Sequence, residues 1–245
     1  MRIQEAKMAS KSDNINDAVW RAINKTINKF REHPDYFFTE SDIHSYFYHA
    51  LYSSDHTESN LNVGEIDIYC IHREYPTNFR YKKLELLNKN YKKPYDLSLR
   101  EGKRGNYDIA VLDPVFIKNA NTKQDIVNKS VKLLEIRTKN NNNFVNSKEL
   151  LFAIEFKYVI NNSRKFIDEV IMDNKKLLFA KDSGGAHEAV NLVFCNVNFK
   201  YEDDLIGVIK KASDEILSVF IQSYYKDGEK ITSKPKMNKK ESRIK

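Results

Sequence analysis

One stretch, "ELLFAIEFKYVI" (residues 149–160), limits the possible folds of this chain more than any other. Apolar and β-branched residues run through it almost without a break, which is typical of a strand buried on both faces. Glu155 and Lys157 interrupt this run. Because strand side chains alternate with a period of two, both charges point to the same face. Burying either charge alone is costly, so the pattern predicts a structural ion pair or a strand that ends at a hydrated site needing both groups.

The residues before this strand predict two helices and two strands. Apolar residues recur at helical spacing from Ile15 to Phe30, and "TESDIHSYFYHAL" begins a second helix with Thr39 as its cap. The stretches "IDIYCIHREYP" and "NYDIAVLDP" are typical of strands, which we expect to end at Pro76 and Pro114. A polar, asparagine-rich insertion follows, with a short helix expected over residues 126–136.

The residues after the strand predict helix, strand and helix. A helix is expected from about Ser163, a strand at "AVNLVFCNVNF", and a long amphipathic helix over residues 202–225. The whole order indicates an α/β protein with a mixed central sheet flanked by helices. We expect one domain over residues 1–225, with its core at about 39–225, and a basic, disordered tail over residues 226–245.

Composition excludes several classes of protein. No apolar run reaches the length of a transmembrane helix, and the first residues lack the apolar centre of a signal peptide. Cys70 and Cys195 lie in apolar runs and are too few for a zinc site or a disulfide framework. The sequence has no Walker-type or dinucleotide-type glycine loop. We therefore expect a cytoplasmic protein with two reduced thiols and no nucleotide-driven chemistry.

The net charge of +7 is concentrated in two places. The tail from Lys226 to Lys245 holds eight basic and three acidic residues, a net of +5, and the stretch from Arg80 to Arg104 holds nine basic and three acidic residues, a net of +6. Tyrosines are interleaved with the second group, a pattern found in nucleic-acid-binding proteins, although solvated charged loops are also common. The residues expected to bind nucleic acid are Arg80, Lys82, Lys83, Lys103 and Arg104.

A second acidic residue belongs with the pair in the buried strand. Asp108 lies near the start of the apolar strand "NYDIAVLDP". If this strand is the hairpin neighbour of the next, Asp108 lies beside Glu155, with Lys157 close by. Two adjacent carboxylates repel each other unless a cation or proton lies between them, and oxygen ligands suit Mg²⁺ or Mn²⁺. The lysine can orient an attacking water or stabilise charge on a phosphate, so the set favours metal-dependent phosphodiester hydrolysis.

The residues "YD" and "IEFK" resemble the motif of the PD-(D/E)xK nuclease superfamily, whose core runs helix, three strands, helix, strand. The resemblance implies that Asp108 and Glu155 bind the metal and that Lys157 is the catalytic lysine. It also implies that Phe156 offers its backbone carbonyl. In several branches the helix before the first strand adds a glutamate, and the helix "FTESDIHSYFYHAL" is similar, which makes Glu40 the candidate.

Two departures from the family pattern stand beside these matches. Tyr107 occupies the position of the family's proline, and 47 residues separate Asp108 from Glu155, which requires an insertion. Glu74, in the first expected strand, is a rival of Glu40. Other groups have ordinary explanations: His44 and His49 are five residues apart and share a helix face poorly, and Lys175 and Lys176 are expected on a solvated helix face.

The sequence thus favours a Mg²⁺- or Mn²⁺-dependent nuclease, with nucleic acid (DNA first) as its partner and a homodimer as a further expectation. One alternative keeps the fold but makes the chain a binding or structural module without catalysis, and exclusive pairing of Glu155 with Lys157 would favour it. Another is an unrelated cytoplasmic α/β protein whose lysine-rich tail aids solubility. A large separation between Asp108 and Glu155 would favour the latter.

Overall fold

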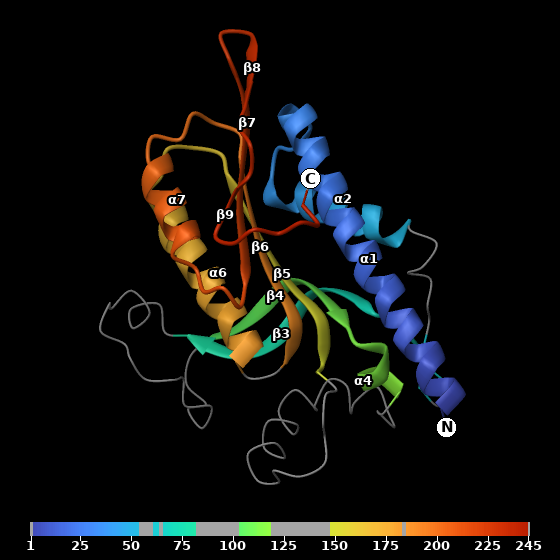
Figure 1. Cartoon of the computed structure of the whole chain (residues 1–245). Coiled ribbons are helices and arrows are strands. Elements are labelled where there is room, and N and C mark those ends of the chain that lie inside the picture. Colours follow the sequence, from blue (N-terminus) through green and yellow to red (C-terminus); the bar gives the residue numbers. More distant parts are fainter. Residues whose placement is uncertain are drawn as a thin grey trace.

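The computed structural model of the chain describes residues 2–53, 61–63, 66–81, 103–118, 148–182 and 185–244 (Figure 1). The helices are α1 (Arg2–Glu32), α2 (Glu40–Tyr52), α4 (Pro114–Lys118), α6 (Lys165–Asp182) and α7 (Glu202–Lys210), with a 3₁₀ turn η1 (Pro34–Tyr36). The strands are β1 (Leu61–Val63), β2 (Ile66–Ile68), β3 (Ile71–Tyr81), β4 (Lys103–Leu112), β5 (Leu150–Val159), β6 (Ala186–Cys195), β7 (Leu217–Lys226), β8 (Glu229–Thr232) and β9 (Lys236–Met237).

The main sheet is mixed, as expected. Its order is β3-β4-β5-β6-β7-β8, and β9 also pairs with β7. Strands β3, β4 and β5 are antiparallel neighbours, whereas β5, β6 and β7 run parallel. The parallel pairs are joined through α6 and α7, the crossover connections that such pairs require. Strands β1 and β2 form a separate two-stranded sheet.

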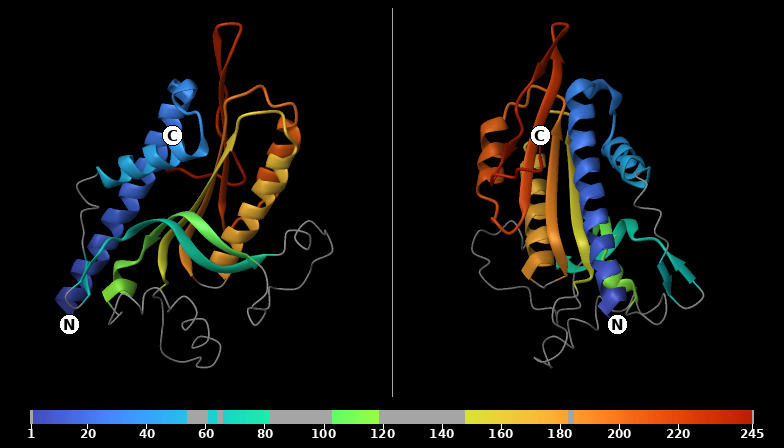
Figure 2. Two further views of the ribbon diagram at one scale, coloured as in Figure 1. Left: turned by 180° about the vertical axis from the view of Figure 1, so that it is seen from behind. Right: turned by 45° about the vertical axis from the view of Figure 1, so that its right-hand side comes forward.

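Helices cover both faces of the sheet (Figure 2). On one face α1 buries Trp20 against Phe152 and Phe30 against Phe194, with ring centroids 5.7 and 5.0 Å apart. On the same face α2 packs Phe47 against Phe156, with centroids 5.3 Å apart. On the other face α6 and α7 enclose a second apolar cluster, which includes Val159. The residues of β5 therefore alternate between two apolar layers, which accounts for its nearly unbroken hydrophobic run.

The prediction of one long closing helix over residues 202–225 is wrong. Helix α7 ends at Lys210, and β7 begins at Leu217. The apolar run of β7 is buried between β6 and the antiparallel strands β8 and β9. An apolar run of this length fits helical and extended periods alike, and sheet pairing decides between them.

The basic tail is also ordered, contrary to expectation. Asp227 and Gly228 form a tight turn with φ of 51° and 82°, after which β8 pairs with β7. Aspartate followed by glycine favours this turn because both central residues need positive φ. Beyond it, β9 pairs with Val219 and Phe220. Arg243 then lies over the ring of Trp20, 4.0 Å from its centre.

Strand β3 extends beyond its expected end at Pro76 and reaches Tyr81. It is an edge strand, where a residue without an N–H is tolerated, and the β3–β4 register shifts between Pro76 and Arg80. The helix expected over residues 126–136 lies outside the described residues, as do Lys82 and Lys83.

Asn238 provides a test of how the C-terminal segment contributes to stability. Its Oδ1 accepts a hydrogen bond from the Ser218 amide, and its Nδ2 donates to the carbonyls of Ser213 and Ile216. Asn238→Ala leaves these three groups without that partner, so we expect the free energy of unfolding to fall by about 1–3 kcal/mol. Urea denaturation measures the change, with the exposed Lys240→Ala as control. Equal stability of the two variants would contradict this role.

Candidate metal centre

The site lies where β4 and β5 separate. Their last paired position joins Ile109 to Ile154, and beyond it the β3–β4 hairpin turns away from β5 (Figure 1). Two amides of β5 then bond to side chains instead of a strand. Phe156 N donates to Asp108 Oδ2 at 2.7 Å, and Tyr158 N donates to Glu40 Oε2 at 3.1 Å. Carboxylates from two different elements therefore converge on one stretch of strand backbone that β4 does not pair.

Helix α2 is fixed so that its first residue reaches this gap. Thr39 and Asp42 form a reciprocal capping box at its N-terminus. The hydroxyl of Tyr158 donates to the carbonyl of Phe37 at 2.5 Å and joins the segment before the helix to β5. Glu40, directly after the cap, is held over the end of β5 by these contacts.

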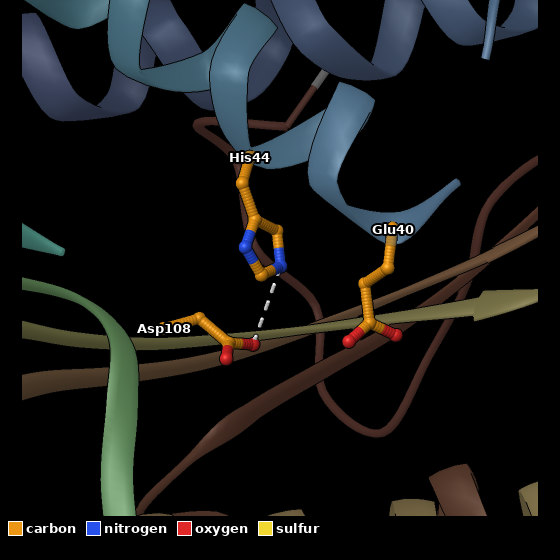
Figure 3. A group of neighbouring side chains, drawn as sticks. All are labelled: Glu40, His44 and Asp108. Atoms are coloured by element: carbon orange, nitrogen blue, oxygen red, sulfur yellow. Dashed lines mark ion pairs between the residues drawn. The ribbon is translucent and has the colours of Figure 1, made fainter. Parts of the chain in front are cut away.

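Three potential metal ligands meet at the gap (Figure 3). Glu40 and His44 are one helical turn apart on α2. One potential ligand atom of Glu40, one of His44 and one of Asp108 all lie within 4.8 Å of one another. His44 Nε2 lies 3.6 Å from Asp108 Oδ2. Burial lowers the pKa of His44, so this contact joins a neutral imidazole to a carboxylate at neutral pH. Within the described residues Nε2 has no hydrogen-bond partner, which leaves it able to bind a cation.

Glu155 lies next to this group, on the face of β5 toward α6. It is 2% exposed, and its Oε2 lies 2.6 Å from Lys176 Nζ. Its Oε1 is buried without a hydrogen-bond partner in the part of the chain that the structure describes. Burial first and the charge of Asp108 second raise the pKa of Glu155. Burial also raises the pKa of Asp108 to about 6, although the Phe156 amide and Lys176 oppose the shift. A bound cation would stabilise both carboxylates in their charged forms.

Lys157 contacts other partners than its neighbour in the motif. Its Nζ lies 3.1 Å from Glu40 Oε2 and 3.7 Å from Glu169 Oε2. Burial lowers the pKa of this ammonium, but Asp173, Glu40 and Glu169 outweigh burial and hold its pKa above the ordinary value. Lys157 is therefore charged at neutral pH and suited to stabilising negative charge. Glu155 and Lys157 are not an exclusive ion pair, because each contacts a residue of another element.

The centre as a whole is acidic. Its carboxylates outnumber its buried ammonium groups, which belong to Lys157 and Lys176; the carboxylates are Glu40, Asp108, Glu155, Glu169 and Asp173. Burial raises the pKa of Asp173 to about 6 as well, with Lys176 and Lys157 opposing. Carboxylate oxygens with one imidazole nitrogen form a donor set that fits a small divalent cation, and the imidazole favours Mn²⁺ relative to Mg²⁺.

The structure brings together Asp108, Glu155, Lys157 and Glu40, the residues that the sequence motif singled out. Glu74 lies on β3, takes a φ of 51°, and accepts a bond from Asn106 Nδ2 at 3.5 Å. It does not belong to the group of ligand atoms around His44 in the described residues. Its backbone conformation points to a local irregularity of the edge strand.

The basic residues predicted to bind nucleic acid lie on the β3–β4 hairpin where they are described. Arg80 pairs with Arg104, and Tyr81 pairs with Lys103, at the end of the hairpin farthest from Ile71. This end of the hairpin leads into residues 82–102, which are outside the described part. The hairpin that carries Asp108 thus also carries this basic group.

The sequence pattern predicts ordinary roles for two residues that lie in the centre, His44 and Lys176. The spacing of His44 from His49 argued against a shared face, but its spacing of four from Glu40 was the informative one. Lys176 was expected to be solvated, yet its side chain is 13% exposed and contacts Glu155 and Asp173. No local sequence signal identifies Lys176, because its burial depends on the distant strand β4, where it donates to the carbonyl of Asn106.

Comparisons with protein-family models, with curated proteins and with solved structures gave no match to this chain. Within the described residues, none of the helices combines the length and apolar character needed to cross a bilayer. The functional interpretation therefore depends on the geometry of the site.

Proposed function

We propose that this protein is a divalent-metal-dependent nuclease that hydrolyses phosphodiester bonds in nucleic acid, with DNA as the first substrate to test. One observation carries the proposal: Asp108, Glu40 and His44 converge where β4 leaves β5, beside the buried Glu155 and the charged Lys157. When the separate strands β1 and β2 and the short helix α4 are left aside, the elements from α2 to β6 run helix, three strands, helix, strand. This is the order implied by the resemblance to the PD-(D/E)xK superfamily.

Asp108 and Glu155 would hold the metal, with Glu40 and His44 as further ligands. When bound, a divalent cation supplies Lewis-acid stabilisation of a phosphate and lowers the pKa of bound water. The chain itself supplies Lys157, whose ammonium can stabilise negative charge that develops on the phosphate. Because that ammonium is charged, it suits this role better than accepting a proton from water.

A second candidate function is a nucleic-acid-binding module with the same fold and no catalysis. The observation that favours it is the 2.6 Å contact between Lys176 Nζ and Glu155 Oε2. An ammonium at this position neutralises one carboxylate of the centre and competes with a cation for it. Oε1 of Glu155 still lacks a hydrogen-bond partner among the described residues, which supports the metal-binding proposal over this one.

Cleavage assays distinguish the two functions. Labelled duplex, branched and single-stranded DNA, and RNA, are incubated with the full chain and Mn²⁺ or Mg²⁺, and EDTA serves as the control. A nuclease gives products that depend on the metal. A chain that binds these substrates but leaves all of them intact with either metal is a binding module.

Metal binding should depend on pH. Asp108 has a pKa raised to about 6, so it is protonated in acid where an ordinary aspartate is charged. A proton on the carboxylate excludes the metal, so Mn²⁺ affinity should fall by about tenfold per pH unit below about 6. Calorimetric titrations between about pH 5 and 7.5 measure this dependence. Equal affinity across that range would contradict a ligand role for Asp108.

A further inference from the structure

Two aromatic side chains project into solvent just before the metal centre. Phe38 is 77% exposed and Tyr36 is 55% exposed, whereas Phe37 between them is buried. Phe38 lies two residues before Glu40. A large aromatic ring in water is unfavourable, so two exposed rings in the short segment that leads into Glu40 point to a binding surface. We call Tyr36 and Phe38 the aromatic rim.

The backbone under the aromatic rim is firmly held. The amides of Phe38 and Thr39 both donate to Asp42 Oδ2 at 2.8 Å. On the other side of Phe38, the carbonyl of Phe37 accepts the Tyr158 hydroxyl. The ring of Phe38 is therefore presented by a fixed turn next to Glu40, and little backbone entropy remains to be lost when a ligand binds.

Tyr36 lies beside a positive charge. Its ring stacks on His33, with centroids 4.5 Å apart and planes 14° apart, and Lys29 Nζ lies 4.6 Å from its centre. Lys230, on β8, reaches the same end of α1 and donates to the carbonyl of Glu32. Aromatic rings are thus combined with ammonium groups, the combination that binds single-stranded nucleic acid by base stacking and phosphate attraction.

We propose that the aromatic rim stacks unpaired bases and guides single-stranded nucleic acid to the metal centre. The inference extends the proposed function and rests on it for the identity of the ligand. Bases inside a duplex are already stacked on each other, so their faces cannot reach Phe38. The rim therefore favours single-stranded segments over continuous duplex.

Binding assays without metal test the rim independently of cleavage. The probe is a fluorescent oligothymidylate of about 20 nucleotides, longer than the roughly 4–16 nucleotides covered by a typical single-strand site. Phe38→Ala should weaken binding by about 5- to 100-fold, which corresponds to loss of one stacked base, and Phe38→Trp should retain it. Tyr52→Ala is the matched control, because Tyr52 is 43% exposed at the other end of α2. Binding of a blunt duplex of the same length should change little in Phe38→Ala.

Several outcomes would overturn the inference. They are absence of oligothymidylate binding by the wild type, equal binding by Phe38→Ala, and an equal loss on single strand and duplex. A further outcome of this kind would show that the aromatic rim is a contact between copies of the protein. In that case Phe38→Ala would abolish self-association in sedimentation experiments and leave oligothymidylate binding intact. A wild type that binds through Phe38 but cleaves nothing with Mn²⁺ would support the rim and contradict the nuclease proposal, so the two can fail separately.

Discussion

Replacing Lys157 with methionine is expected to reduce metal-dependent cleavage by about 10²- to 10⁴-fold, the contribution typical of a charge-stabilising group. The reason is the position of its ammonium, 3.1 Å from Glu40 and held in the charged state by surrounding carboxylates. Methionine fills a similar volume, and Glu40 keeps its bond to the Tyr158 amide, so the fold should persist.

The matched control for this variant is Lys165→Met. Lys165 contacts the same Glu169 at 2.7 Å, but its side chain is 70% exposed. We expect near wild-type cleavage from it. Initial rates at saturating Mn²⁺ and thermal unfolding of both variants separate catalysis from stability. Full activity of Lys157→Met would exclude a catalytic role and leave Lys157 as a structural partner of Glu40.

Asp108→Asn should abolish cleavage by a different route, through weakened metal binding. Asparagine retains an oxygen for the Phe156 amide, which now donates to Asp108 at 2.7 Å, so the strand geometry can be kept while the charge is lost. Changes outside the ligand sphere of metal sites cost about 10- to 100-fold in affinity, and loss of a ligand charge should cost at least the upper end of that range.

Calorimetric titration with Mn²⁺ measures this loss, and excess Mn²⁺ should restore part of the cleavage. Asp168→Asn, on the exposed face of α6, removes the same charge outside the centre and should leave affinity and rate unchanged. Tight Mn²⁺ binding by Asp108→Asn would place the metal elsewhere.

The core of the site could be predicted because it follows from strand periodicity. Glu155 and Lys157 interrupt an apolar run at positions of equal parity, and Asp108 interrupts the preceding strand. Antiparallel pairing of consecutive strands then brings Asp108 one position beyond the last pair, Ile109 with Ile154. Both inferences use only the alternation within a strand and the pairing of consecutive strands. The mixed sheet flanked by helices, which the order of the elements predicts, is also found in the structure.

The parts that could not be predicted depend on long-range contacts. Residues 217–226 are extended because β6 and β8 flank them, although their apolar pattern also suits a helix. The basic tail looks solvated by composition, but Asn238 and Arg243 fix it to β7 and α1. Lys176 enters the centre because α6 packs beside β5 and brings Lys176 to Glu155. The spacing of residues in the sequence does not predict this contact.

The most direct test of the metal centre is anomalous diffraction from crystals of the full chain soaked in Mn²⁺. We expect one strong peak between Asp108, Glu40 and His44, within bonding distance of a carboxylate oxygen of Asp108. Glu155 is expected to turn an oxygen toward the same ion and to share or release Lys176. A crystal that binds Mn²⁺ elsewhere, or one in which Lys176 and Glu155 stay paired and no peak lies beside Asp108, would contradict the proposed nuclease centre.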